Sequence, residues 1–133
     1  MATNLFDIKG KVVVVTGACG VIASAAIKYF AAQGCKVVLL AREKRREEAE
    51  KTVAEIKAEG GEAMFLASDV MSKENLEQNL KDIIAAYGTV DVLLNSAGGN
   101  LGAANVAPDK TIFDLDIDAI KQVTELNIFG TII

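Results

Sequence analysis

The chain has 133 residues, of which 51% are hydrophobic, and a formal net charge of −4. This length predicts a single domain with one hydrophobic core. The acidic balance, the lack of histidine and the aromatic content of 5% argue against a nucleic-acid surface, which needs basic patches and stacking rings. No membrane-spanning segment is predicted, because the uncharged run 12–27 is too short and is interrupted by glycines.

The two cysteines bear on metal binding and on the cellular compartment of the protein. Cys19 and Cys35 have no further cysteine or histidine with which to complete a metal site, so we expect no bound metal and two reduced thiols. Reduced thiols are typical of a cytoplasmic protein. The N-terminal residues 1–7 agree, because they lack the basic and apolar regions of a secretory signal.

A buried strand, a glycine turn and a helix open the chain. Four consecutive valines from Val12 predict a strand that is buried on both faces, as at the centre of a parallel sheet. After the turn, the helix predicted over Val21–Ala32 has one apolar face, formed by Ile22, Ala26 and Phe30. The turn directs a helix N-terminus and free N–H groups towards one point, which suits a phosphate, although a plain tight connection would look the same.

Two more strands follow, with a helix between them. Lys36–Leu40 predicts a second buried strand, which completes a β-α-β unit. The charged segment Arg42–Glu59 predicts a surface helix with one face on the sheet, because three apolar residues recur at helical spacing: Ala49, Val53 and Ile56. Gly60 and Gly61 end this helix, and Met64–Ala67 predicts a short third strand.

The next helix has recognisable ends. Ser72 is a suitable N-cap and Gly88 the expected C′ residue. The apolar positions between them recur every three or four residues: Leu76, Leu80, Ile83 and Tyr87. Val90–Leu94 then predicts the fourth strand. Strands that alternate with helices at this spacing predict an α/β fold with a doubly wound parallel sheet.

The last part of the chain combines a loop and a helix. Residues 99–116 show no periodicity, so we expect a long irregular loop of a kind that is often functional. Asp116 or Asp118 caps a final helix with one shared face: Ile120, Val123 and Asn127. The sequence then ends at Ile133 without a helix stop signal. We interpret 1–133 as the incomplete, C-terminally truncated dinucleotide-binding domain of a longer enzyme, which ends inside a helix.

The candidate binding residues follow the predicted strands. In a doubly wound sheet, ligands bind beyond the carboxyl ends of the strands, near the switch in strand order. The segments at those ends are Thr16–Gly17, Ala41–Arg42, Asp69–Val70 and Asn95–Gly98. We expect them to converge on one crevice.

Four motifs, in this order and at these spacings, resemble the short-chain dehydrogenase/reductase family: Thr16-Gly17, Asp69-Val70, Asn95-Ser96-Ala97-Gly98 and Leu126-Asn127-x-x-Gly130. The resemblance covers the whole chain. It implies a Rossmann-type fold and hydride transfer between NAD or NADP and a secondary alcohol or ketone. The glycine turn, Ala97–Asn100 and Ile112–Asp116 are also similar to a sugar-acid subset, the D-mannonate oxidoreductase (fructuronate reductase) type.

The resemblance implies roles for individual residues. The pyrophosphate turn would consist of Gly17, Ala18, Cys19, Gly20, Val21 and Ile22. Asp69 would accept from the adenine amino group beside the Val70 amide, and the adenosine ribose and nicotinamide side would face Asn95, Ala97 and Gly98. Asn127 would position a water in the proton relay. Simpler roles remain open: Asp69 as a helix-entry cap, Asn95 as a turn-former and Asn127 as a buried amide bonded to a main-chain carbonyl.

Two sequence features bear on the cofactor. Val21 and Ala23 replace family glycines, and since valine avoids positive φ, Val21 is expected to narrow the approach to the phosphates. After the second strand, an acidic residue would bind the ribose hydroxyls and repel a 2′-phosphate, but this chain has Arg42, with basic residues also at 44–46. We therefore expect NADP, with NAD as the alternative, although basic residues are ordinary at the start of an exposed helix.

The family's catalytic serine and Tyr-x-x-x-Lys pair come after the asparagine helix and do not occur in these 133 residues. Neither Tyr29 nor Tyr87 is followed by lysine four positions later. We therefore expect the chain alone to be inactive, and the longer enzyme to act on a small-molecule substrate as a homo-oligomer. Two other hypotheses stay open: a non-catalytic dinucleotide-binding or interaction module, and a nucleotide-free Rossmann domain, which only Val21 favours.

Overall fold

A four-stranded parallel sheet in the order β3-β2-β1-β4 forms the centre of the structure, a computed structural model that describes residues 6–133. The strands are β1 (Val12–Thr16), β2 (Lys36–Ala41), β3 (Glu62–Ala67) and β4 (Val92–Leu94). β1 pairs with β2 on one side and with β4 on the other, so the strand order switches between β1 and β4. This confirms the predicted α/β, doubly wound Rossmann-type fold.

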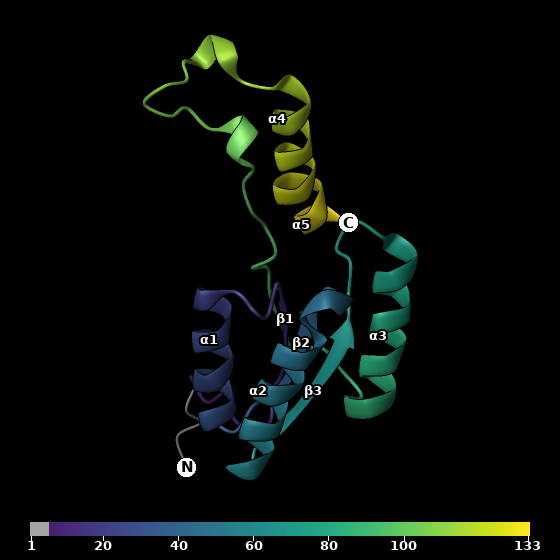
Figure 1. Cartoon of the computed structure of the whole chain (residues 1–133). Coiled ribbons are helices and arrows are strands. Elements are labelled where there is room, and N and C mark those ends of the chain that lie inside the picture. The colour runs from purple at the N-terminus through teal and green to yellow at the C-terminus, as the bar shows by residue number, and fades with distance from the viewer. Residues whose placement is uncertain (1–5) are drawn as a thin grey trace.

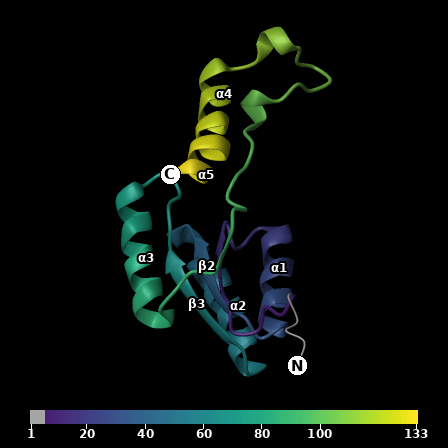
Figure 2. The same ribbon diagram turned by 180° about the vertical axis from the view of Figure 1, so that it is seen from behind.

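Helices cover both faces of the sheet (Figures 1 and 2). Helices α1 (Val21–Ala32) and α2 (Arg46–Ala58) lie on one face, and α3 (Lys73–Tyr87) lies on the other. The final helical segment stands above the carboxyl ends of the strands and consists of α4 (Ile117–Thr124), a π-helical stretch (Glu125–Phe129) and α5 (Gly130–Ile132). No helix among residues 6–133 has both the length and the apolar character needed to cross a membrane.

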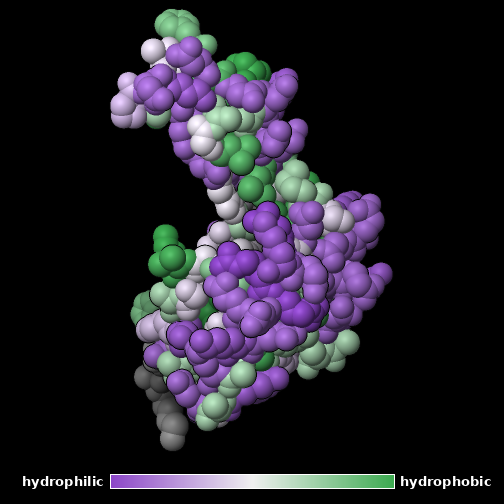
Figure 3. Space-filling model, in the orientation of Figure 1, coloured by the Kyte–Doolittle hydropathy of each residue, from purple (hydrophilic) through white to green (hydrophobic). Residues whose placement is uncertain are grey.

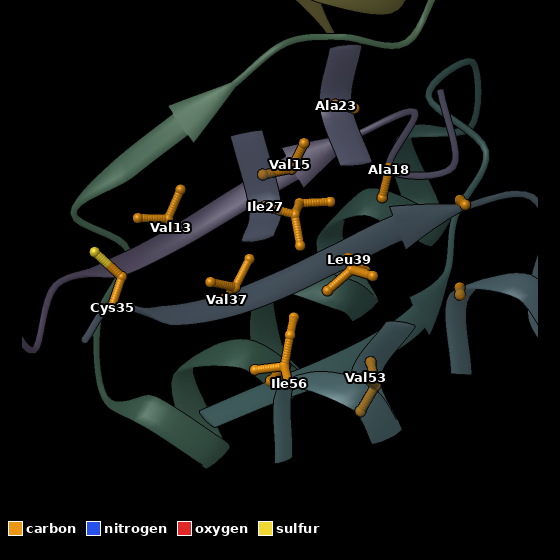
Figure 4. Packing of buried hydrophobic residues seen from close by; sticks show 13 residues of the cluster. Val13, Val15, Ala18, Ala23, Ile27, Cys35, Val37, Leu39, Val53 and Ile56 are labelled. Carbon is orange, nitrogen blue, oxygen red and sulfur yellow. The ribbon is translucent and has the colours of Figure 1, made fainter. Parts of the chain in front are cut away.

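The core has one apolar cluster on each face of the sheet. Alternate valines of β1 point in opposite directions: Val13 and Val15 join the cluster under α1 and α2 (Figure 4), and Val12 and Val14 join the cluster under α3. All four are at most 3% exposed. Burial of β1 on both faces is therefore confirmed.

The predicted apolar face of α1 is confirmed for Phe30, which packs against the cluster under α1 and α2, but not for Ile22. The fully buried residues of α1 are Ala23 and Ile27, whereas Ile22 is 82% exposed. Most of the α1 sequence is apolar, so spacing alone cannot select which side meets the sheet. In the structure, Ala23 and Ile27 rather than Ile22 lie over the core.

The other helix predictions are largely confirmed. α2 buries the expected stripe of Ala49, Val53 and Ile56, although it begins at Arg46 after a 3₁₀ turn, Glu43–Arg45. In α3, the Ser72 side chain accepts from the Asn75 N–H at 3.3 Å, and Gly88 ends the helix with φ 80°. α3 differs from the prediction at two positions. Asn79 is buried, and its Nδ2 donates to the Ala67 carbonyl at 3.2 Å, whereas Leu80, which was expected on the apolar face, is half exposed.

Strand β4 is shorter than predicted because a side chain replaces one main-chain partner. The Asp91 Oδ2 accepts from the Val12 N–H at 2.8 Å, and the Asp91 N–H donates to the Val12 carbonyl at 3.0 Å. The Asp91 carboxylate also meets the Lys11 ammonium at 3.2 Å. Regular pairing with β1 starts only at Val92.

The segment 99–116 is a protruding loop, as expected, with two short 3₁₀ turns, Gly102–Ala104 and Ile112–Asp114. It leads away from the sheet and returns to α4 (Figure 1), and a narrow waist separates this upper part from the sheet region (Figure 3). Of the two candidate caps, Asp116 is the N-cap of α4, since its Oδ1 accepts from the N–H groups of Asp118 and Ala119.

Candidate functional site

A cleft of about 370 Å³ lies at the carboxyl ends of the strands. It is lined by eight of the twelve predicted cofactor residues: Gly17, Cys19, Gly20, Arg42, Asp69, Val70, Ala97 and Gly98. Seven further residues complete the lining: Leu40, Ala41, Arg45, Ser68, Met71, Ser96 and Leu126. The predicted convergence of the strand ends on one crevice is therefore seen in the structure.

Gly17 allows the glycine turn to touch the segment that follows β4. Its φ is +61°, and a Cβ at this position would lie 2.7 Å from the Ala97 Cα. The turn is also tied to β2, because the Ala18 N–H donates to the Leu40 carbonyl at 3.1 Å. The backbone of the turn thus lies in close contact with the ends of two other strands and forms one wall of the cleft.

Gly20 is the N-cap of α1, and it presents that helix end to the cleft. Gly20 provides no side-chain cap, and the first turn of α1 has no acidic residue. The unpaired N–H groups and the positive end of the helix dipole are therefore not neutralised by a side chain of this turn. Such an end favours an anionic ligand group.

Three residues of the predicted turn do not line the cleft. Ala18 is buried in the core, whereas Val21 and Ile22 lie on the first turn of α1 and are 90% and 82% exposed. Every non-glycine residue in 6–133 has negative φ, so the position of Val21 does not require the conformation that valine avoids. The conformational reason for doubting Val21 therefore does not apply, whereas a narrowing of the approach to the phosphates by its side chain stays a prediction.

Thr16 joins the end of β1 to the segment after β4. Its Oγ1 accepts from the N–H groups of Ser96 at 3.1 Å and Ala97 at 3.0 Å. Thr16 is 5% exposed, so water cannot readily replace this acceptor. Sequence reasoning placed Thr16 at a strand end but missed this role, for which the signal was a hydroxyl at the end of a run of valines.

Asp69 and Val70 line the cleft just beyond β3. The Asp69 Oδ1 accepts from the Met71 N–H at 2.9 Å, and the Asp69 N–H donates to the Asn75 Oδ1 at 2.7 Å. Asp69 therefore shapes the turn before α3, and Ser72 rather than Asp69 is the N-cap. Val70 is buried against the helical segment above it, because a Cβ at Gly130 would lie 2.9 Å from the Val70 Cγ2.

Ser68, beside these two residues, has a buried hydroxyl. Its Oγ is fully buried, and it has no hydrogen-bond partner within the described part of the chain. Buried polar atoms are almost always paired, by protein or by an ordered water. Since Ser68 lines the cleft, a polar group bound there is a candidate partner. Apart from its place before Asp69, nothing in the sequence distinguishes Ser68.

Of the three arginines after β2, only Arg42 and Arg45 line the cleft. The Arg42 side chain is exposed and makes no hydrogen bond or ion pair with any residue of 6–133. Arg45 is engaged: its Nη2 donates to the Cys19 carbonyl at 3.1 Å, and its Nε donates to Glu48 at 2.7 Å. Arg46 does not line the cleft and contacts a different set of residues: Glu43, Glu50 and the Phe65 ring.

The Cys19 thiol lies on the same wall and is protonated at neutral pH. Burial raises the pKa of this thiol, and the Glu48 carboxylate raises the pKa further, against the opposing effect of Arg45. The Sγ is 3.8 Å from the Arg45 carbonyl oxygen, to which it donates. Cys19 and Arg45 therefore contact each other through two bonds of opposite direction.

The Asn127 side chain bonds the final helical segment to Gly99, which follows the Asn95–Gly98 motif after β4. Its Nδ2 donates to the Gly99 carbonyl and to the Val123 carbonyl, both at 2.7 Å, and its Oδ1 accepts from the Gly99 N–H at 3.2 Å. A Cβ at Gly98 would lie 2.6 Å from this Oδ1. The side chain thus bonds main-chain groups, as the simpler alternative proposed, but it is exposed rather than buried. A role in positioning water stays a prediction.

Asn95 is placed away from the cleft. It lines a second, mainly apolar cavity of about 240 Å³, together with residues of β1, α3 and the end of the chain, among them Val14, Ile83 and Ile133. The predicted contact of Asn95 with the adenosine ribose is therefore not supported by its position in the lining. Ala97 and Gly98, from the same motif, do line the cleft.

Comparison with known proteins identifies the family. Residues 11–133 match the model of the short chain dehydrogenase family. The chain belongs to the short-chain dehydrogenases. It is 35% identical over 132 residues to UxuB, an uncharacterised oxidoreductase of Bacillus subtilis, and the match covers 93% of this chain but 47% of UxuB. This short-chain dehydrogenase chain thus spans about half the length of the curated relatives that it matches.

Two solved short-chain dehydrogenases hold nicotinamide cofactors. A candidate D-mannonate oxidoreductase of Haemophilus influenzae with bound NAD has a TM-score of 0.85 and 32% identity, over 95% of this chain and 48% of that one. A variant of actinorhodin polyketide ketoreductase with NADPH has a TM-score of 0.79 and 28% identity, over 92% of this chain and 44% of that one. Both cofactor types are thus found among proteins with this fold.

The two tyrosines of this short-chain dehydrogenase chain do not line the cleft. Tyr29 is exposed on α1 and packs edge-to-face on Phe30. Tyr87 ends α3, where the Lys36 Nζ lies 5.4 Å from the ring centroid. Burial raises the pKa of Tyr87, and Glu62 raises it further, which is opposite to what a proton donor at neutral pH requires.

Proposed function

We propose that the chain is the dinucleotide-binding part of an NAD(P)-dependent oxidoreductase whose cofactor transfers a hydride to or from a secondary alcohol or ketone. The observation that carries this proposal is the cleft at the carboxyl ends of β1, β2 and β3, where a glycine turn, a helix N-terminus and Asp69 meet. Membership of the short-chain dehydrogenase family supports the same chemistry.

The residues present fit such a cofactor. Gly17 and Gly20 leave the backbone uncovered at the start of α1, which suits a pyrophosphate. On the β3 side, Asp69 has an exposed carboxylate for the adenine amino group, and the unpaired Ser68 hydroxyl lies beside it. Ala97 and Gly98 would lie towards the ribose and nicotinamide. The cofactor would supply the hydride, and these residues would bind and orient it.

We propose NADP as the preferred cofactor, with NAD as the alternative, because Arg42 is a cation on the cleft that pairs with no other residue of 6–133. A 2′-phosphate would gain a charge-assisted bond from this guanidinium, whereas NAD has no charged group there. Replacing Arg42 with glutamine should weaken NADP⁺ binding about tenfold and leave NAD⁺ binding unchanged.

Isothermal titration calorimetry with the 133-residue chain tests both proposals. Arg46→Gln is the matched control, since it removes the same charge from a residue that pairs with Glu43 and Glu50 and does not line the cleft. The wild-type chain and this control should bind NADP⁺ alike. A chain that is folded by circular dichroism but binds neither dinucleotide would contradict the proposed function and support a nucleotide-free domain.

We propose a sugar acid of the D-mannonate or fructuronate type as the substrate of the longer polypeptide. The similarity to the Haemophilus influenzae protein supports this substrate class. Activity of the longer polypeptide with such acids, and none with simple alcohols, is the expected result. We further propose that this polypeptide is a homo-oligomer, because Ile128, Phe129 and Ile132 leave an apolar helix side at least half exposed.

We expect the 133-residue chain to bind cofactor without turnover, because neither tyrosine lines the cleft. Incubation with NADP⁺ and a panel of secondary alcohols, followed at the absorbance of NADPH, should give no signal above the buffer rate. Turnover at an enzymatic rate would show that the proton donor has been misplaced. Saturable binding without turnover is also what a non-catalytic module would show, and activity of the longer polypeptide separates the two.

A further inference from the structure

Arg45 lies on the cleft wall, and two of its three guanidinium nitrogens, Nε and Nη2, already have partners. It donates to the Cys19 carbonyl at 3.1 Å, and the Cys19 thiol donates back to the Arg45 carbonyl at 3.8 Å. These two bonds join the glycine turn after β1 to the 3₁₀ turn after β2. Two separate segments of the cleft wall are thereby held together.

Glu48 holds the guanidinium in this position. It lies in the first turn of α2, three residues after Arg45, and accepts from the Arg45 Nε at 2.7 Å. The carboxylate is close enough to the glycine turn to raise the pKa of the Cys19 thiol. Glu48 therefore places a negative charge next to the wall on which Arg42 lies, an arginine without a partner among residues 6–133.

We propose that Glu48 sets the cofactor preference of the cleft by holding Arg45 on the glycine turn, which leaves Arg42 alone for a 2′-phosphate. The inference rests on the proposed dinucleotide binding. A phosphate dianion is bound best by several donors, and a guanidinium can offer two at once. Glu48 binds the Arg45 guanidinium, and its carboxylate also repels the phosphate. Glu48 therefore weakens the NADP preference that the basic residues at 42 and 44–46 predict.

Arg45 consequently acts as a positioning residue for the turn and not as a phosphate ligand. Its loss should loosen the wall that both dinucleotides share. Arg45→Gln is therefore expected to weaken the binding of NAD⁺ about threefold. It should weaken the binding of NADP⁺ further, because the Glu48 carboxylate next to the phosphate loses its partner. If Arg45 bound the 2′-phosphate instead, the same variant would weaken NADP⁺ alone.

Glu48→Gln is the direct test, and Glu50→Gln is its matched control. Glu50 lies on the same helix but pairs with Arg46, which does not line the cleft. Dissociation constants of NAD⁺ and NADP⁺ are measured by calorimetry for the 133-residue chain and its variants, with circular dichroism melting to show that each is folded. Glu48→Gln should raise the affinity for NADP⁺ relative to NAD⁺ about tenfold, and Glu50→Gln should leave the ratio unchanged.

The possible outcomes separate this inference from the proposed function. An unchanged ratio in Glu48→Gln, with both dinucleotides still bound, overturns the role of Glu48 and leaves the proposed function intact. Unchanged NAD⁺ binding in Arg45→Gln overturns it as well. Binding of neither dinucleotide to the folded wild-type chain overturns both proposals.

Discussion

Replacing Gly17 with alanine tests whether the turn is shaped by contact with the β4 segment. The new Cβ would lie 2.7 Å from the Ala97 Cα and 2.7 Å from the Ser96 carbonyl oxygen, which are backbone atoms that cannot rotate away. The φ of +61° costs an alanine about 1–2 kcal/mol. The overpacking adds about 1–3 kcal/mol, so we expect the free energy of unfolding to fall by about 2–5 kcal/mol.

Gly60→Ala separates the two contributions. Gly60 has φ +83°, but a Cβ there would meet no atom within 4 Å, so only the backbone cost of about 1–2 kcal/mol applies. Urea unfolding followed by circular dichroism gives both values in the same chain. Equal losses of stability in the two variants would refute the steric part of the argument, and with it the close approach of the turn to Ala97.

The side chains of Thr16 and Asp91 connect β1 to the segments that flank β4. Thr16→Val should cost about 1–3 kcal/mol in urea unfolding, because two partly buried backbone N–H groups lose their acceptor, whereas Thr16→Ser keeps the oxygen and should cost less than about 1 kcal/mol. For Asp91, the Val12 N–H and then the Lys11 ammonium lower the pKa in the folded state. The wild-type chain should therefore have a higher free energy of unfolding than Asp91→Asn, with the full difference above about pH 4 and a smaller one as the pH falls further. A difference that stays constant from about pH 6 to about pH 3 would exclude this linkage.

The sheet could be predicted from the sequence because its signals are local. The valine run marks β1 as a central strand regardless of what packs against it, and Ser72 and Gly88 cap α3 through their own conformational preferences. The candidate residues at the strand ends could be predicted for a related reason. In a parallel sheet, the carboxyl ends of all strands meet at one edge, so Gly17 and Asp69 converge without any knowledge of side-chain contacts.

Features set by long-range contacts could not be predicted. The burial of Asn79 depends on the Ala67 carbonyl, and the late start of β4 depends on the Asp91 carboxylate bonding the Val12 N–H. Neither partner is near in sequence. In the site, the same applies to Thr16 and Arg45: charge patterning grouped Arg45 with Arg42, but only the fold shows that its guanidinium is taken by Cys19 and Glu48.

Val21 shows how a family pattern can mislead when the geometry behind it is not known. A glycine was expected at this position for positive φ, but Val21 is the first residue of α1, has negative φ and directs its side chain to solvent. Val21→Gly should therefore change stability by less than about 0.5 kcal/mol, since valine and glycine differ little in helix propensity. The affinity for both dinucleotides should stay within about twofold. A tenfold gain in affinity for both dinucleotides in calorimetry would show instead that the Val21 side chain obstructs the pyrophosphate.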